Sequence, residues 1–318
     1  MKNFAKLIKL TLLVATSTVM FSCSDDDDAA PMVENNSIAA IASRNPNFST
    51  LVSALDRAGL VQTLDQNGPF TVFAPTNAAF QEFLDDNGFN SLNDIPVDAL
   101  REVLLNHVVN GTNLSTGLTT GYVKTLGKGS ASSSNTLSMF INTAGGNVRL
   151  NGVSSVTTPD IVATNGVIHV VDAVIGLPTV VTHALANPNF TSLVGALTSP
   201  GQPDFVGILS GTTDSPFTVF APSNDAFTTF ESQNPGTLAS LSAGQLTSVL
   251  TYHVVAGANV LSTGIPSGPI TTLETGTFTV NGTVITDEAG RQTNIVAVDV
   301  QASNGVIHVL DNIILPNL

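Results

Sequence analysis

The stretch PFTVFAPTNAAF, residues 69–80, returns later in the chain as PFTVFAPSNDAF, residues 216–227. Each copy has a short run of β-branched and aromatic residues that ends at a proline and is followed by a hydroxyl residue. Such a run favours a β-strand, and a hydroxyl residue just before an apolar helical pattern favours a helix N-cap. Thr76 and Ser223 therefore mark a strand-to-helix junction that the chain uses twice. Asp225 adds a negative charge that suits the first turn of the second helix.

Three further blocks repeat in the same order. NPNFSTLVSAL at 45 returns as NPNFTSLVGAL at 187, NHVVNG at 106 as YHVVAG at 252, and NGVIHVVDAVI at 165 as NGVIHVLDNII at 304. A separation of this length indicates a duplicated domain, because short structural repeats recur about every 20–50 residues. We therefore expect one domain at residues 37–178 and a second at 179–318, with almost no linker around Pro178.

Each copy reads as helices followed by strands. Phe48, Leu51 and Leu55 share one face of a helix, and VDALREVLL, residues 97–105, predicts another helix that runs into the strand HVV. The last third is rich in strand signals, and DIVAT and VIHVV are separated only by Asn165 and Gly166. Both residues tolerate a positive φ, so we expect a tight type I′ hairpin there. The pattern predicts an α+β fold with an antiparallel sheet.

The blocks TVFAPTNAAF, NHVVNG and DIVATNGVIHVVD closely resemble the two signature boxes and the intervening tyrosine-histidine element of fasciclin I domains. The resemblance extends over both expected domains. It implies two tandem fasciclin-like domains, each with helices packed on an antiparallel β wedge. Such domains occur in extracellular and cell-surface proteins that mediate adhesion, and membership implies no catalytic activity in general.

The N-terminal segment has the pattern of an export signal. Three lysines precede the apolar run LTLLVATSTVMF, residues 10–21, which is shorter than the roughly 20 residues of a membrane-spanning helix. The only cysteine, Cys23, follows in a stretch that resembles the lipobox of bacterial lipoproteins, where the cysteine is lipidated. We expect a lipoprotein signal peptide at residues 1–22 and an acidic tether at 23–36. A coincidental cysteine in an ordinary signal peptide is the alternative.

The acidic run SDDDD after Cys23 resembles the signal that exports lipoproteins of Bacteroidota to the outer cell surface. It implies a lipid-anchored protein of the outer membrane that is exposed on the cell, while a solvated spacer is the alternative. Without the three lysines before Cys23, 7 basic and 24 acidic residues give a net charge of 7 − 24 = −17. A chain this acidic repels phosphate backbones, so we expect no nucleic-acid partner.

Two histidines recur inside aliphatic strands. Side chains alternate along a strand, so His169 and Asp172 point to opposite faces and cannot form a catalytic pair, and the same holds for His308 and Asp311. Apolar neighbours on both sides favour structural histidines whose ring nitrogens find partners within the fold. A functional histidine is the alternative.

A second pair, His107 and His253, is expected where a helix ends and a strand begins. A histidine at a helix C-terminus can donate a hydrogen bond to the free carbonyl oxygens of the last turn. The family resemblance places a tyrosine before this histidine. Tyr252 retains it, whereas Asn106 replaces it in the first copy, which argues against tyrosine-dependent binding there. Tyr252, His253 and His107 are candidates for partner contact, with a framework role as the favoured interpretation of the histidines.

The segment PDIVATNGVIHV resembles the one that carries integrin-recognition residues in some animal members of the family. Pro159, Asp160 and Ile161 match its short element, while Thr158 and Val162 depart from it. These three residues are therefore candidates for partner contact. The alternative is that Asp160 turns or caps the backbone before the hairpin, as aspartate often does.

Catalytic and metal motifs are missing from the sequence. There is no HxxxH, CxxC or DxDxDG spacing, and no GxSxG elbow. We expect no metal, no cofactor and no catalytic residue. The leading hypothesis is a surface protein that binds an extracellular protein or polysaccharide. A module for small apolar ligands or lipids is the second hypothesis, and a hydrolase the third.

Overall fold

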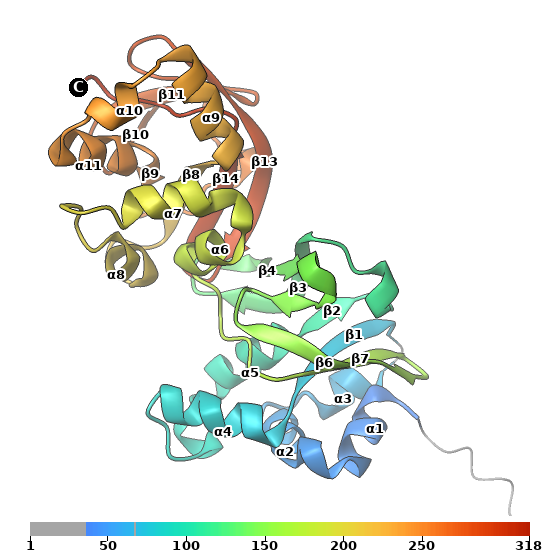
Figure 1. Ribbon diagram of the computed structural model, residues 1–318. Coiled ribbons are helices and arrows are strands. Elements are labelled where there is room, and N and C mark those ends of the chain that lie inside the picture. Colours follow the sequence, from blue (N-terminus) through green and yellow to red (C-terminus); the bar gives the residue numbers. More distant parts are fainter. Residues whose placement is uncertain (1–35, 67) are drawn as a thin grey trace, which may run out of the picture. The chain divides into compact units, whose positions relative to one another are not determined.

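The computed structural model describes residues 36–66 and 68–318, and within them one α+β fold occurs twice in tandem (Figure 1). The expected signal peptide and most of the expected tether lie outside the described residues. None of the helices in the described part of the chain is long and apolar enough to cross a membrane.

The first copy begins with three helices, inserts a strand, and continues with two helices before its remaining strands. Its helices are α1 (Ile38–Arg44), α2 (Ser49–Arg57), α3 (Val61–Asp65), α4 (Asn77–Asp86) and α5 (Val97–Leu105). Its strands are β1 (Phe70–Pro75), β2 (Val108–Asn110), β3 (Gly121–Gly129), β4 (Ser132–Asn142), β5 (Arg149–Leu150), β6 (Ser154–Ala163) and β7 (Gly166–Val171).

The second copy follows the same order with one more short helix. Its helices are α6 (Val180–Ala186), α7 (Thr191–Leu197), α8 (Phe205–Ser210), α9 (Asn224–Gln233), α10 (Thr237–Ser240) and α11 (Ala243–Tyr252). Its strands are β8 (Phe217–Pro222), β9 (Val254–Val255), β10 (Pro269–Thr271), β11 (Thr277–Asn281), β12 (Val284–Thr286), β13 (Gln292–Ala302) and β14 (Gly305–Leu310).

The strand-to-helix junction forms as its sequence predicts. The side chain of Thr76 accepts a hydrogen bond from the Ala79 amide at 3.2 Å and so caps α4. Ser223 caps α9 in the same way through the Ala226 amide, also at 3.2 Å. Capping of this kind satisfies an amide that has no partner inside the helix. Each junction thus fixes the direction in which a helix leaves the sheet.

The sheets are mostly antiparallel, as expected, and each contains one parallel pair of strands. In the first copy β1 to β7 close into a barrel in chain order, and β1 pairs with β7 in parallel. The second copy is an open sheet with the order β10-β11-β12-β13-β14-β8-β9, in which β14 and β8 are the parallel pair. The first and last strands of a copy run in the same direction, and sequence alternation does not reveal this.

The expected hairpin exists, but the predicted turn type is wrong. Strands β6 and β7 pair as far as Ala163 and Gly166, so the turn residues are Thr164 and Asn165. Neither has a positive φ, whereas a type I′ turn requires one at both central residues. The Asn165 side chain instead accepts from the Ile38 amide at 2.9 Å and donates to the carbonyl oxygens of Leu64 and Gln66, both at 2.8 Å. It therefore ties the hairpin to the helices.

Gly166 is required by packing against the neighbouring strand. A Cβ at this position would collide with the carbonyl of Phe70 in β1, and the φ of Gly166 is +150°. Gly305 meets the carbonyl of Phe217 in β8 in the same way. Both residues of the NG dipeptide therefore have a structural role. The Asn165 side chain binds the helices, and the absence of a side chain at Gly166 lets β7 lie close to β1.

Candidate functional site

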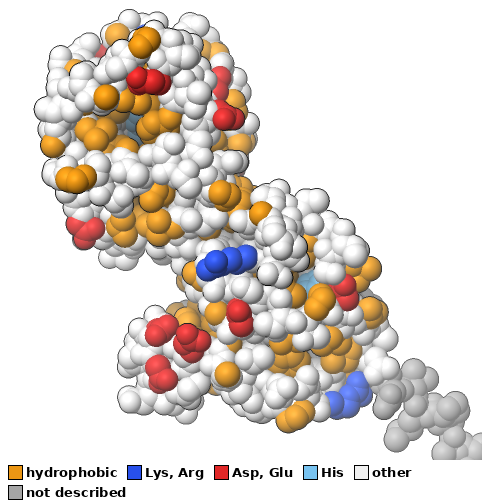
Figure 2. Space-filling view, in the orientation of Figure 1, with side chains coloured by type: hydrophobic (Ala, Val, Ile, Leu, Met, Phe, Trp, Pro, Cys, Tyr) orange, Lys and Arg blue, Asp and Glu red, His pale blue; other side chains and the backbone are white. Residues whose placement is uncertain are grey.

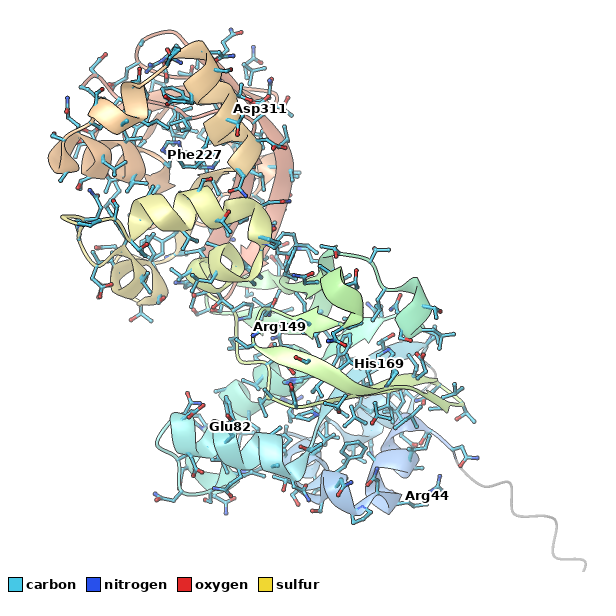
Figure 3. All side chains as sticks on the ribbon, in the orientation of Figure 1. Arg44, Glu82, Arg149, His169, Phe227 and Asp311 are labelled. Atoms are coloured by element: carbon cyan, nitrogen blue, oxygen red, sulfur yellow. The ribbon has the colours of Figure 1, made fainter. Side chains whose placement is uncertain are left out.

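His169 belongs to a small polar cluster in the first copy (Figure 3). Its ring is buried, and Nδ1 accepts a hydrogen bond from the Asp160 amide at 3.2 Å. Nε2 lies 2.9 Å from the Asn113 carbonyl oxygen, to which it can only donate. The Asp160 carboxylate accepts from the Ser115 amide at 2.8 Å and from the Ser115 hydroxyl at 2.5 Å. These bonds hold the loop before β3 against strands β6 and β7.

The cluster contains serine, aspartate and histidine, but it is not arranged for catalysis. In a catalytic triad the histidine takes the serine proton and the aspartate orients the histidine. Here the Ser115 hydroxyl donates to Asp160, and the Nε2 of His169 is occupied by a backbone carbonyl. Hydrogen bonds from Ser115 also hold the pKa of Asp160 below its usual range. The geometry gives the hydroxyl no histidine base.

The second copy repeats the arrangement. Ser262 bonds to Asp299 through its amide at 2.8 Å and its hydroxyl at 2.6 Å, and His308 Nε2 lies 2.9 Å from the Val260 carbonyl oxygen. Asp160 and Asp299 have φ values of 62° and 60°, a left-handed conformation that aspartate tolerates. Burial lowers the pKa of His308. Its Nδ1 has no hydrogen-bond partner among the described residues, which is the one difference from His169.

His107 and His253 are buried at the ends of α5 and α11. In each ring Nδ1 donates to a carbonyl one helical turn back, at 2.7 Å in the first copy and 2.8 Å in the second. Nε2 accepts from a backbone amide, that of Ile175 at 2.8 Å and that of Ile314 at 3.3 Å. Burial lowers the pKa of both histidines to about 4. They are neutral and join a helix end to the last segment of each copy.

Tyr252 is also buried, and its hydroxyl donates to the Thr277 carbonyl oxygen at 2.7 Å. Its ring meets Phe278 edge-on with centroids 6.0 Å apart, and burial raises its pKa. Asn106 takes the equivalent place in the first copy and donates to the Gly176 carbonyl oxygen at 3.0 Å. The burial of Tyr252, His253 and His107 fits a framework role and leaves these side chains no surface for direct contact with a partner.

The third candidate element, residues 159–161, is partly accessible to solvent. Pro159 is exposed on β6, where the ladder with β7 is irregular between Thr158 and Ile161. Asp160 is committed to Ser115, and Ile161 packs against the core. The neighbouring Val162 is 69% exposed. A partner would therefore meet Pro159 and Val162, while Asp160 and Ile161 shape the segment beneath them.

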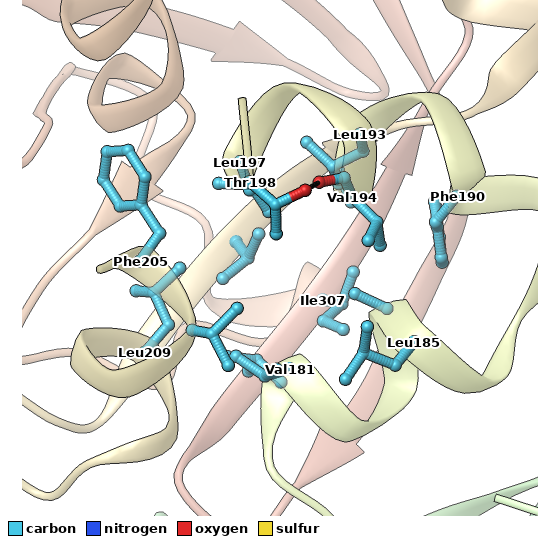
Figure 4. A pocket seen from close by; sticks show the side chains of 15 residues that line it. Val181, Leu185, Phe190, Leu193, Val194, Leu197, Thr198, Phe205, Leu209 and Ile307 are labelled. Carbon is cyan, nitrogen blue, oxygen red and sulfur yellow. Dashed lines mark hydrogen bonds between the residues drawn. The ribbon is translucent and has the colours of Figure 1, made fainter. Parts of the chain in front are cut away.

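An apolar pocket opens in the second copy between α6, α7 and α8 (Figure 4). Its walls include Leu185, Leu193, Leu197, Phe205, Leu209 and Ile307. The narrow cavity has a volume of about 40 Å³ and lies within about 510 Å³ of empty space that includes its open mouth. The matching position in the first copy holds a cavity of about 20 Å³. The two copies thus differ at this point.

Metal binding has no support in the described part of the chain, where no three His, Cys, Asp or Glu side chains converge as ligands of one ion.

The surface of the described residues carries few charged side chains, as Figure 2 shows for one face.

A model of the fasciclin domain matches residues 46–178 and again residues 188–316. The chain belongs to the fasciclin domain family. The tandem copies described above are therefore two fasciclin domains.

Fasciclin proteins of very different origin are similar to this chain. Protein sll1483 of Synechocystis is 41% identical over 145 residues, which cover 43% of this chain and 73% of that protein. Human periostin is 28% identical over 269 residues, or 82% of this chain and 30% of periostin. A solved fasciclin domain pair from the insect cell adhesion molecule fasciclin I shares the fold, with a TM-score of 0.50 and 22% identity over 83% of this chain and 92% of that one. The family includes cell adhesion and interaction proteins.

Sequence reasoning missed two features of these fasciclin domains. Ser115 and Ser262 were not recognised as partners of the aspartates, although LSTG occurs at both 114–117 and 261–264 and could have indicated them. The pocket was not located either. Two differences between the copies could have indicated the pocket. The segment after α7 differs from the one after α2, and Leu185 stands where the first copy has Ser43.

Proposed function

We propose that this chain is a non-enzymatic, lipid-anchored protein of the outer cell surface whose two fasciclin domains bind an extracellular protein or a matrix polysaccharide. The observation that carries the proposal is the match of both halves of the chain to a family of adhesion and interaction proteins. The Ser–Asp–His clusters support it, because their serine hydroxyls donate to aspartate and not to histidine, as a catalytic triad would require. A second function, the binding of an apolar ligand, is favoured by the pocket of the second copy.

The anchor depends on Cys23, which lies outside the described residues. Several acyl chains, at roughly 0.8 kcal/mol per buried CH₂, would hold the protein to a membrane more firmly than one chain. Cys23→Ala should therefore leave the protein soluble or unprocessed. The measurement is cell fractionation combined with incorporation of labelled palmitate. Normal labelling and membrane fractionation of the variant would show that Cys23 is not the anchor.

The proposed contact surface is the β6 segment around Pro159, where Pro159 and Val162 face solvent. The chain would be tested against a panel of extracellular matrix proteins, polysaccharides and components of the cell's own envelope. Pro159→Ser and Val162→Ser together should weaken binding to the partner found, by roughly tenfold if about 1.4 kcal/mol of contact is lost. Val153→Ser is the control, because Val153 is 55% exposed elsewhere in the same copy.

Two results would contradict these assignments separately. Binding that survives the double substitution would move the contact away from β6 while leaving the interaction itself in place. Failure of the intact chain to bind any macromolecule in the panel would count against the interaction function as a whole.

A further inference from the structure

We propose that the pocket between α6, α7 and α8 binds the hydrocarbon chain of an uncharged lipid or fatty alcohol. This proposal rests on the second function proposed above, the binding of an apolar ligand by the second fasciclin domain, and it is independent of the surface interaction on β6. The proposal is supported by the chemistry of the lining, the different geometry of the two copies, and the charge of the second copy.

The lining gives a ligand apolar contact and no hydrogen bonds. Fourteen of its fifteen residues are apolar, and the exception is Thr198. The Thr198 hydroxyl already donates to the Val194 carbonyl oxygen at 2.9 Å, as the dashed line in Figure 4 shows. A polar group that entered the pocket would lose its water and gain no partner, which is costly. The part of the ligand inside the pocket must therefore be a hydrocarbon.

The pocket is wider than its counterpart because the chain diverges after α7. Helix α2 continues to Arg57, and the buried residues Ala58 and Leu60 then fill the space before α3. Helix α7 ends at Leu197, the equivalent of Leu55, and an exposed Thr198 opens the longer connection TSPGQPD, residues 198–204. No buried apolar residue from this connection takes the place of Ala58, so α8 leaves a gap beside α7. The second copy thus has the larger of the two cavities.

The mouth of the pocket carries exposed apolar side chains. Leu185 is 59% exposed and Val206 38% exposed, and both belong to the lining. Ile208, on the same helix as Val206, is 45% exposed. The first copy has the polar residue Ser43 at the position of Leu185. Hydrophobic side chains also gather over the second copy in Figure 2. An apolar rim around an apolar cavity suits a chain that enters from solvent or from a membrane.

Charge and width restrict the ligand further. Residues 179–318 contain one basic residue, Arg291, and nine acidic residues, for a net charge of 1 − 9 = −8. No lysine or arginine lines the pocket to neutralise a carboxylate or phosphate, so an anionic head group is repelled. The narrow cavity of about 40 Å³ admits the end of a slender chain rather than a ring system, and the remainder of the chain would lie along the open mouth. These constraints lead to an uncharged head on an unbranched chain.

Binding can be measured on the full-length chain with parinaryl alcohol, an uncharged, slender polyene alcohol whose emission rises in apolar surroundings. Dodecan-1-ol should displace the probe. Dodecanoate, with the same chain length and a negative charge, and adamantan-1-ol, with a bulky ring skeleton, should displace it far less. Vesicles of a neutral diacyl lipid, added in place of the alcohol, show whether the chain can be drawn from a membrane or only from solution. Displacement by either source supports the proposal.

Two substitutions test the location of the site. Val194→Phe fills the cavity and should abolish the displaceable signal. Leu185→Ser introduces the residue of the first copy at a position that is 59% exposed, and it should weaken probe binding by roughly tenfold if about 1.4 kcal/mol of contact is lost. Val296→Ser is the matched control, because Val296 is also 59% exposed and lies outside the pocket. Unchanged probe binding in Leu185→Ser, or equal displacement by dodecanoate and dodecan-1-ol, would overturn the proposal.

Discussion

At the scale of single residues, the buried histidines act as hydrogen-bonding connectors between segments that are distant in sequence. His169 joins the β6 turn to the carbonyl of Asn113, and His107 joins the end of α5 to Ile175. Imidazole suits this role because one nitrogen donates while the other accepts. Each buried ring thereby hydrogen-bonds two backbone groups, as buried polar groups require.

Replacement of the strand histidines should therefore lower stability and spare binding. His169→Ala and His308→Ala are each expected to reduce the free energy of unfolding by about 1–3 kcal/mol, through an unsatisfied carbonyl and a small cavity. His169→Ala should be the more costly, since His169 also accepts from the Asp160 amide while His308 Nδ1 has no partner among the described residues. Thermal unfolding measures the loss, and binding of the folded variants to the partner is the companion assay. Unchanged stability with lost binding would instead make these histidines functional.

The histidines at the helix ends predict a pH dependence. The pKa of His107 and of His253 is about 4 in the folded chain, against 6.5 for an unperturbed histidine. The unfolded state thus binds protons more readily, so this contribution to stability is complete above about pH 6.5 and is lost as the pH falls toward 4. Urea unfolding at pH 7.5 and pH 4.5 should show the decrease, and the variant with both His107→Gln and His253→Gln should show a smaller one. Equal decreases in both proteins would rule out these histidines as the cause.

At the scale of secondary-structure elements, the parallel pair of first and last strands organises each fasciclin domain. The Phe70 and Phe217 carbonyls pass so close to β7 and β14 that only glycine fits opposite them. Gly166→Ala and Gly305→Ala should each lower stability by about 1–3 kcal/mol, because an added methyl group forces the strands apart. Gly176→Ala is the control, since no atom lies within 4 Å of a Cβ added there. Chemical denaturation of the three variants makes the comparison, and a loss of the same size at Gly176 would argue against the steric explanation.

The elements whose signals are local were predictable from the sequence. The caps at Thr76 and Ser223, the helix that carries Leu51 and Leu55, and the β6–β7 hairpin all depend on residues that are neighbours in the chain. The parallel pairing and the contacts within the Ser115–Asp160–His169 cluster were not predictable, although the repeated LSTG marks the serine, because they depend on the route of the chain through space. The size of the pocket depends on the distance between α7 and α8, and a hydrophobic pattern does not predict the distance between two helices.

At the scale of the whole molecule, each copy has its own hydrophobic core. The buried members of every apolar cluster within the described residues come from one copy only, with Phe48 and Phe80 in one cluster and Phe190 and Phe217 in another. A core of this kind is what an independently folding domain requires.

A cut at Pro178 should therefore give two fragments, residues 36–178 and 179–318, that fold separately. Each fragment is expected to be soluble and to unfold cooperatively, because each retains both strands of its parallel pair. Circular dichroism during thermal unfolding is the measurement, with the intact chain for comparison. A fragment that stays unfolded alone would show that the boundary is misplaced or that the copies depend on each other for stability.

The parallel pair also determines when a domain can fold during synthesis. Phe70 aligns with Gly166, 166 − 70 = 96 residues later, and Phe217 aligns with Gly305, 305 − 217 = 88 residues later. A nascent copy that has left the ribosome without its final strand lacks the parallel partner of its first strand. Contacts this distant in sequence form slowly, since a long loop must close first. The first fasciclin domain should thus remain open to chaperones for most of its own translation and close only when the hairpin that carries His169 arrives.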